Sequence, residues 1–139
     1  MGGGGAYSYT LYDYLGRITE VGQKKQTQQM TSLLSRDTTQ LKNWLAVVYT
    51  NSANARVKAE QVTYTKYDEP DDAIQLPMPV PVNQKWYTLR NRVSHTRYYE
   101  WLYTIGNSGK VSYGNYDNST TYSYDIHGNV DTLLQQYRT

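Results

Sequence analysis

The sequence predicts a mainly β fold, a twisted antiparallel meander or ribbon of hairpins with one short helix near residues 38–48. A turn-forming cassette occurs twice, near the two ends of the chain, and stretches of alternating apolar and polar residues lie between the copies. The 139 residues include 16 Tyr and 3 Trp but no Phe. Tyrosine favours strands because its ring is apolar while its hydroxyl tolerates water. The length predicts a single domain with a core of its own.

The cassette consists of an aromatic residue, an aspartate, two variable residues, a glycine, a polar residue and a new apolar run. Aspartate suits the first position of a type I turn because its carboxylate accepts nearby backbone N–H groups. Glycine suits the fourth position, where a hairpin bulge requires a positive φ. The sequence therefore predicts two structural turns, formed by Tyr12, Asp13, Gly16, Arg17, Tyr124, Asp125, Gly128 and Asn129.

The two cassettes resemble the YD repeat of the RHS/YD-repeat family, whose pattern is close to Tyr-Asp-x-x-Gly-Arg followed by an apolar residue. The first copy matches this pattern through Arg17, whereas the second has Asn129 in that place. Tyr122 supplies the tyrosine that often stands two residues ahead of the pair; in the first copy Tyr9 stands three residues ahead. The cassettes together cover about a quarter of the chain.

Alternation of apolar and polar residues predicts most of the strands. Residues 22–35 are rich in Gln, Lys, Thr and Ser and are expected to form a loop. Residues 86–105 give the strongest strand pattern, with a bend near Asn91 or Ser94, and His95 and Arg97 on the apolar side predict an incompletely buried middle. The expected strands are residues 7–14, 18–21, 57–67, 86–105, 110–116, 120–124 and 130–136.

The one predicted helix covers residues 38–48. Leu41, Trp44, Leu45 and Val48 follow the i, i+3, i+4, i+7 spacing of an apolar helix face. Asp37 and Gln40 form a plausible capping pair ahead of them. We expect the helix to pack on the sheet, within an irregular insert at about residues 22–56 of a β domain that spans residues 7–139.

Tyr67 and Asp68 repeat the start of the cassette without its glycine, which predicts a degenerate repeat whose turn is replaced by a longer loop. The loop continues into a proline-rich connector at about residues 69–83. Proline alternates with apolar residues there, and proline cannot donate a ladder hydrogen bond, so the segment is expected to be extended and outside the sheet. A ligand for a proline-binding module is the alternative.

Composition and motifs favour a non-catalytic protein without cofactor or metal. The formal net charge is +2 and cysteine is absent, so charge does not indicate nucleic acid and disulfides are excluded. His95 and His127 lack partners at metal-ligand spacing. No apolar run reaches membrane-spanning length, and residues 1–6 look like a flexible glycine-rich leader without the features of a secretory signal.

A further prediction concerns ligand binding along the longest predicted strand. Exposed Trp and Tyr faces suit sugar rings, and basic residues beside them also suit single-stranded nucleic acid. Of these two we favour carbohydrate and expect no nucleic-acid partner. The candidate ligand-binding residues are Trp86, Trp101, Arg90 and Arg92.

The family resemblance implies a structural segment of a β shell that serves secretion, surface display, or encapsulation and delivery of a toxin in bacteria. It implies a secreted or cell-surface location and an enclosed toxin polypeptide among the partners. The autoprotease core motif of family members is not present, so no catalytic residue is carried over. A ribbon cut to this length has two open edges, which predicts self-association or pairing with other YD-repeat segments.

Overall fold

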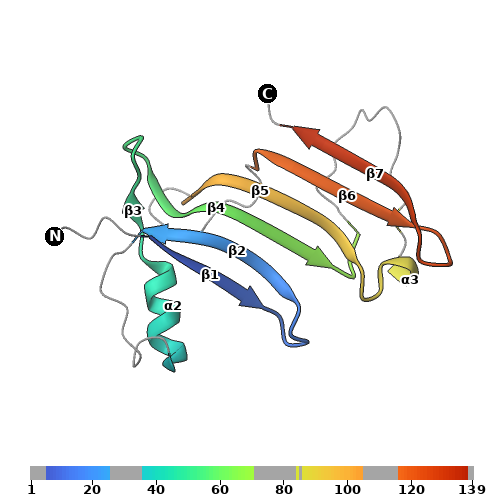
Figure 1. Cartoon of the computed structure of the whole chain (residues 1–139), viewed down its shortest axis with the longest axis horizontal. Helices are drawn as coiled ribbons and strands as arrows, with labels where there is room; N and C mark the ends of the chain where they lie inside the picture. Colours follow the sequence, from blue (N-terminus) through green and yellow to red (C-terminus); the bar gives the residue numbers. More distant parts are fainter. Residues whose placement is uncertain (1–5, 26–35, 71–83, 85, 105–115, 138–139) are drawn as a thin grey trace.

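The computed structural model describes residues 6–25, 36–70, 84, 86–104 and 116–137. Seven antiparallel strands form one twisted sheet in the order β1-β2-β4-β5-β6-β7, and β3 pairs with β4 at one end (Figure 1). The elements are β1 (Ala6–Tyr12), β2 (Ile18–Lys25), α2 (Thr38–Ala46), β3 (Tyr49–Thr50), β4 (Arg56–Tyr67), α3 (Trp86–Leu89), β5 (Val93–Tyr103), β6 (Asn118–Tyr124) and β7 (Val130–Tyr137). The predicted fold class, mainly β with a short helix, is confirmed.

Two predictions of local secondary structure are wrong. Residues 22–25 continue β2 because Gly22 and Lys24 face the buried side while Gln23 and Lys25 face solvent, a strand alternation hidden by polar composition. The long strand expected over residues 86–105 begins instead with helix α3, and β5 starts only at Val93. Asn91, where a bend was expected, has a φ of 59°. The expected strand at residues 110–116 and most of the proline-rich connector lie outside the described residues.

Helix α2 begins where the capping pair places it. The carboxylate of Asp37 accepts the backbone N–H of Gln40 at 3.1 Å, which satisfies one of the free donors of the first turn. The apolar face meets the sheet through Trp44, which is 4% exposed and contacts the ring of Tyr7 edge-on, with the ring centroids 6.0 Å apart. The helix thus covers the β1–β2 end of one sheet face.

The core lies on the face that α2 partly covers. Ala59 and Val62 of β4 pack against Tyr99 and Leu102 of β5, with tyrosines from β1 and β4 at the margin. The prediction of an incompletely buried middle for β5 is wrong, since His95 is 4% and Arg97 9% exposed. These polar side chains have partners inside: Ser94 Oγ lies 3.2 Å from His95 Nδ1, and the Arg97 guanidinium lies 5.2 Å from the centre of the Tyr116 ring.

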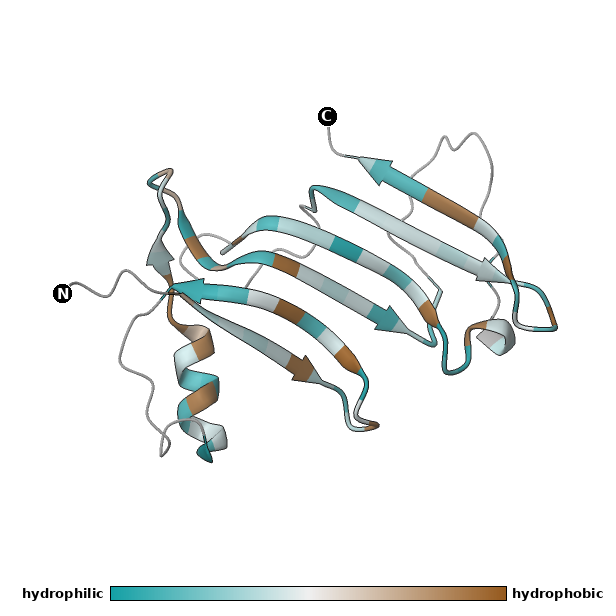
Figure 2. Cartoon of the chain, viewed as in Figure 1, coloured by the Kyte–Doolittle hydropathy of each residue, from teal (hydrophilic) through white to brown (hydrophobic). Residues whose placement is uncertain are grey.

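The opposite face is open and polar, and threonine is prominent on it. Register places Val21 opposite Thr63, Thr63 opposite Tyr98 and Thr96 opposite Thr120, and these side chains are exposed or half-buried. Hydropathy is low over much of this sheet, and hydrophobic segments appear on the outer strands β1 and β7, on β2 and in the centre (Figure 2). No helix among the described residues has both the length and the apolar character needed to cross a bilayer.

Candidate functional site

The first cassette forms the hairpin turn between β1 and β2. The N–H of Gly16 donates to the carbonyl of Asp13 at 3.0 Å, and Gly16 has a φ of 81°. One carboxylate oxygen of Asp13 accepts the N–H groups of Leu15 and Arg17, both at 2.9 Å. These bonds occupy the donors that the reversal leaves without ladder partners.

The second cassette forms the turn between β6 and β7 with the same bonds. Gly128 has a φ of 89°, and its N–H donates to the carbonyl of Asp125 at 3.1 Å. One carboxylate oxygen of Asp125 accepts the N–H groups of His127 and Asn129, both at 2.9 Å. The turns differ in the side chain after glycine: Arg17 donates to Asp13 at 2.8 Å, whereas the Asn129 amide lies 3.4 Å from Asp125.

The pair Tyr67-Asp68 marks a third corner, at the end of β4. In each hairpin the tyrosine is the last residue of the first strand and lies opposite an Ile or Val that opens the second strand. In each, the N–H of the aspartate donates to the carbonyl of the residue just before that Ile or Val. These bonds join Asp13 to Arg17 (2.9 Å), Asp68 to Arg92 (3.2 Å) and Asp125 to Asn129 (2.9 Å).

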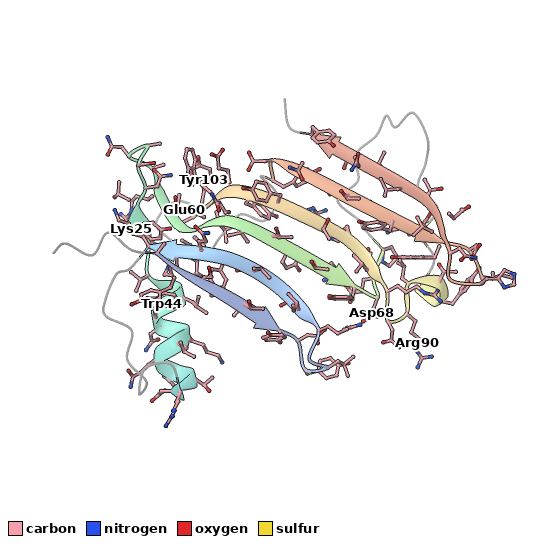
Figure 3. All side chains as sticks on the ribbon, viewed as in Figure 1. Lys25, Trp44, Glu60, Asp68, Arg90 and Tyr103 are labelled. Carbon is pink, nitrogen blue, oxygen red and sulfur yellow. The ribbon has the colours of Figure 1, made fainter. Side chains whose placement is uncertain are left out.

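The shared bonds make Arg92 the counterpart of Arg17, separated from its own Tyr-Asp pair by 23 residues that include α3. The three corners, which we call the Tyr-Asp corners, lie along one end of the sheet (Figure 1). Figure 3 shows Asp68 and Arg90 at this end and Glu60 and Tyr103 at the other. Sequence reasoning missed the role of Arg92, although the Arg-Val pair at residues 92–93 matches the Arg-Ile pair at 17–18.

Each arginine links its hairpin to the next one. The Arg17 guanidinium donates to both carboxylate oxygens of Asp68, at 3.2 and 2.8 Å, and lies 4.4 Å from the centre of the Tyr67 ring. The Arg92 guanidinium lies 5.5 Å from the centre of the Tyr124 ring and donates to the carbonyl of Thr88 at 2.8 Å. A cation over a tyrosine face is an attractive contact, so neighbouring hairpins are joined by repeated side-chain contacts as well as by the ladder.

Charge pairing at the corners favours ionised aspartates. The side-chain hydrogen bond from Arg17 lowers the pKa of Asp68. Desolvation raises the pKa of Asp13, but hydrogen bonds from Arg17 and Leu15 outweigh it and hold that pKa below its ordinary value. The backbone N–H of Asn129 lowers the pKa of Asp125. The Asp68 hydrogen bond is the main reason that the pKa of Arg17 is raised.

These shifts predict a loss of stability in acid. Because the folded-state pKa values of the corner aspartates lie below the ordinary value of 3.8, their contribution is complete above that pH and is lost as the pH falls through the lower values. We expect the free energy of unfolding, measured in denaturant between pH 2 and 6, to fall below about pH 4. Asp68→Asn should flatten that dependence, and an unchanged slope would contradict the assignment.

The two turn glycines allow a matched test of backbone strain. A Cβ at Gly16 has nothing within 4 Å, whereas one at Gly128 would collide with the Arg92 guanidinium. Gly16→Ala should therefore lower the free energy of unfolding by about 1–2 kcal/mol, the cost of holding an alanine in the left-handed conformation. Gly128→Ala should cost more, because Arg92 must also leave the Tyr124 ring. Urea unfolding of both variants measures the difference, and equal losses would contradict it.

Of the predicted ligand-binding residues that the structure describes, Trp101 lies apart from Arg90 and Arg92. Trp101 is half-buried on β5, edge-on to Tyr103 at 6.4 Å between centroids. Arg92 is bound to the Tyr-Asp corners and Arg90 is exposed beside them. Trp101 stands nine positions after Arg92, roughly 30 Å along an extended chain. The side chain of Trp86, at the start of α3, lies outside the described residues.

A second polar site, which sequence reasoning missed, is the buried Lys24 beneath α2. Its side chain is 0% exposed, and its Nζ donates to the carbonyls of Leu45, Val47 and Lys58. Burial lowers the pKa of Lys24 to about 8. A pocket of about 80 Å³ lies nearby between α2 and the sheet, well below the roughly 300–1,000 Å³ of small-molecule sites.

Across the ranges that the structure describes, no group of three or more His, Cys, Asp or Glu side chains could hold a metal ion. Comparison of the chain with protein-family models, with curated proteins and with solved structures finds no match. The Tyr-Asp corners are therefore the candidate functional feature that the geometry itself supplies: a repeated device that joins one hairpin to the next.

Proposed function

We propose that this chain is a non-catalytic structural segment of a larger β shell of the RHS/YD-repeat kind, secreted or displayed at the cell surface. The supporting observation is the repetition of one corner in three successive hairpins, with the same Asp N–H bond closing each. Repeats that contact only their neighbours form extended arrays. A shell wall of this type would enclose or deliver a toxin polypeptide.

The chemistry at the corners supports a structural role. Arg17 donates hydrogen bonds to both Asp13 and Asp68, and Asp68 also accepts the backbone N–H of Asn91 at 2.7 Å. Asp125 accepts the backbone of its own turn. The three corner aspartates and Arg17 are thus used in the turns and in the link to the next hairpin.

The coding sequence on either side of this segment provides a test of the proposal. We expect the flanking coding sequence to encode further Tyr-Asp-x-x-Gly cassettes at hairpin spacing. We also expect surface labelling of intact source cells with a membrane-impermeant amine reagent to modify the protein. Flanking sequence without such cassettes, or protein labelled only after lysis, would overturn it.

Glycan binding through exposed Trp and Tyr remains a prediction and the alternative function. Tryptophan fluorescence titrated with oligosaccharides separates the two. Saturable binding that Trp101→Ala abolishes, with the circular dichroism spectrum retained, would favour the alternative.

A further inference from the structure

The two outer strands have little of the usual protection against pairing. Within the described residues β1 and β7 each pair with one neighbour. β1 has no charged residue and no proline over seven residues, and on β7 the one charge, Asp131, lies at the register shift beside the turn, which leaves Thr132 to Tyr137 without charge, proline or bulge. Natural edge strands are usually short, charged or bulged, because a bare edge invites another strand.

Exposed apolar side chains gather on the same two hairpins. Of the twelve large hydrophobic residues that are exposed in the described part of the chain, ten lie within residues 11–21 and 126–137. They include Leu11 and Val21 on the first hairpin and Val130 and Leu133 on the third. A concentration at both ends of a ribbon indicates surfaces that are covered by neighbours.

The internal joints between hairpins share one register. At the first joint Glu20 of β2 lies opposite Tyr64 of β4, and at the second His95 of β5 lies opposite Thr121 of β6. In both joints, the residue on the earlier strand (Glu20 or His95) lies two positions after the Ile or Val that opens that strand. Its partner on the later strand (Tyr64 or Thr121) lies three positions before the tyrosine of the next Tyr-Asp corner.

We propose that β7 of one molecule pairs antiparallel with β1 of a second copy, in this same register, so that Thr132 lies opposite Tyr9. The proposal rests on the repeat that underlies the proposed function: for the isolated 139-residue chain, the second copy takes the place at the sheet edge that the next hairpin would take in a longer shell. It brings Val130, 54% exposed, to the end of the joint where Leu11, 36% exposed, lies. The joint continues the pairing established between β2 and β4, and because its two surfaces differ, it generates an open head-to-tail chain.

Asn129 makes this joint weaker than the internal ones. Arg17 and Arg92 each cover the tyrosine of the following corner, at 4.4 and 5.5 Å from the ring centres. At the intermolecular joint the equivalent residue is Asn129, and the ring it would face is Tyr12, which is 61% exposed. The amide of Asn129 is uncharged, so the cation–ring contact of the internal joints is missing at this joint. We therefore expect the association to be reversible.

Cysteine pairs test the register, since the chain has no native cysteine. The proposed joint places Leu133 opposite Ser8, both exposed. Mild oxidation of Ser8→Cys/Leu133→Cys at several hundred micromolar should give a ladder of disulfide-linked oligomers. The control Ser8→Cys/Gln135→Cys, two residues out of register, should give little, because a disulfide needs Cα atoms within about 7 Å. No ladder, or equal ladders, would overturn the proposal.

Asn129→Arg tests the missing contact. Light scattering across a concentration series should show association about three- to fivefold tighter than in the unchanged chain. Asn129→Gln should leave association unchanged, and Tyr12→Leu added to Asn129→Arg should remove the gain, with folding of each variant checked by circular dichroism. A strict monomer in every variant would overturn the joint and leave the flanking-gene test intact. A ladder without flanking cassettes would refute only the proposed function.

Discussion

Replacing Tyr99 by alanine is expected to lower the free energy of unfolding by about 3–5 kcal/mol, the largest effect of any single side chain here. Tyr99 is 0% exposed and lies at the centre of the core cluster with Val62 and Leu102. Its removal leaves a cavity that the flanking strands β4 and β6 cannot close, because both are fixed by ladder hydrogen bonds to β5. Urea unfolding followed by circular dichroism gives the value.

The neighbouring Tyr98 provides the matched control. It projects from the same strand to the open face and is half-buried. Tyr98→Ala removes the same atoms but leaves no enclosed cavity, so we expect a loss of about 1 kcal/mol or less. Comparable losses for the two variants would show that the core does not lie on the face that α2 covers.

Replacing Lys24 by methionine is expected to cost about 2–4 kcal/mol. Methionine keeps the apolar stem but removes the donors to the carbonyls of Leu45, Val47 and Lys58, at 3.3, 2.5 and 2.6 Å. Leu45 and Val47 lie at the end of α2, where helix carbonyls lack intrahelical partners and a cation is favourable. The cation also lies 5.3 Å from the centre of the Tyr49 ring.

The loss of these hydrogen bonds is partly offset because the substitution also removes a buried charge. Burial lowers the pKa of Lys24 from 10.5 to about 8, which corresponds to a penalty of roughly 3 kcal/mol that methionine removes. Three buried carbonyls left without a donor cost about 1–3 kcal/mol each, so the loss exceeds the relief. The exposed neighbour Lys25 is the control, and Lys25→Met should change stability by less than about 0.5 kcal/mol.

Lys24 also gives the free energy of unfolding a distinctive pH dependence in alkaline solution. Because its folded-state pKa is below the ordinary value, the unfolded chain binds more protons between about pH 8 and 10, so stability rises with pH in that window. Above about pH 10 burial has the reverse effect through Tyr49 and Tyr99, whose folded-state pKa values are raised. Lys24→Met should lose the rise, and a rise that persists would assign it to another group.

The amino-acid sequence by itself determined the features that depend on local chemistry. Asp13 with Gly16, and Asp125 with Gly128, specify their turns because carboxylate acceptors and a positive φ act within five residues. The Asp37 cap and the apolar stripe of α2 are local for the same reason. The mainly β class follows from strand alternation, which each segment carries alone.

Only the tertiary structure decided which polar residues are buried and which corners are equivalent. The sequence predicts that Lys24 lies in a loop. In the structure, α2 places the carbonyls of Leu45 and Val47 over its side chain. Arg92 takes its place in the repeat only because β5 pairs with β4, since 23 residues of chain separate it from Asp68. Both depend on partners distant in sequence, and the free energy of burying a polar group is set by those partners, not by the residue itself.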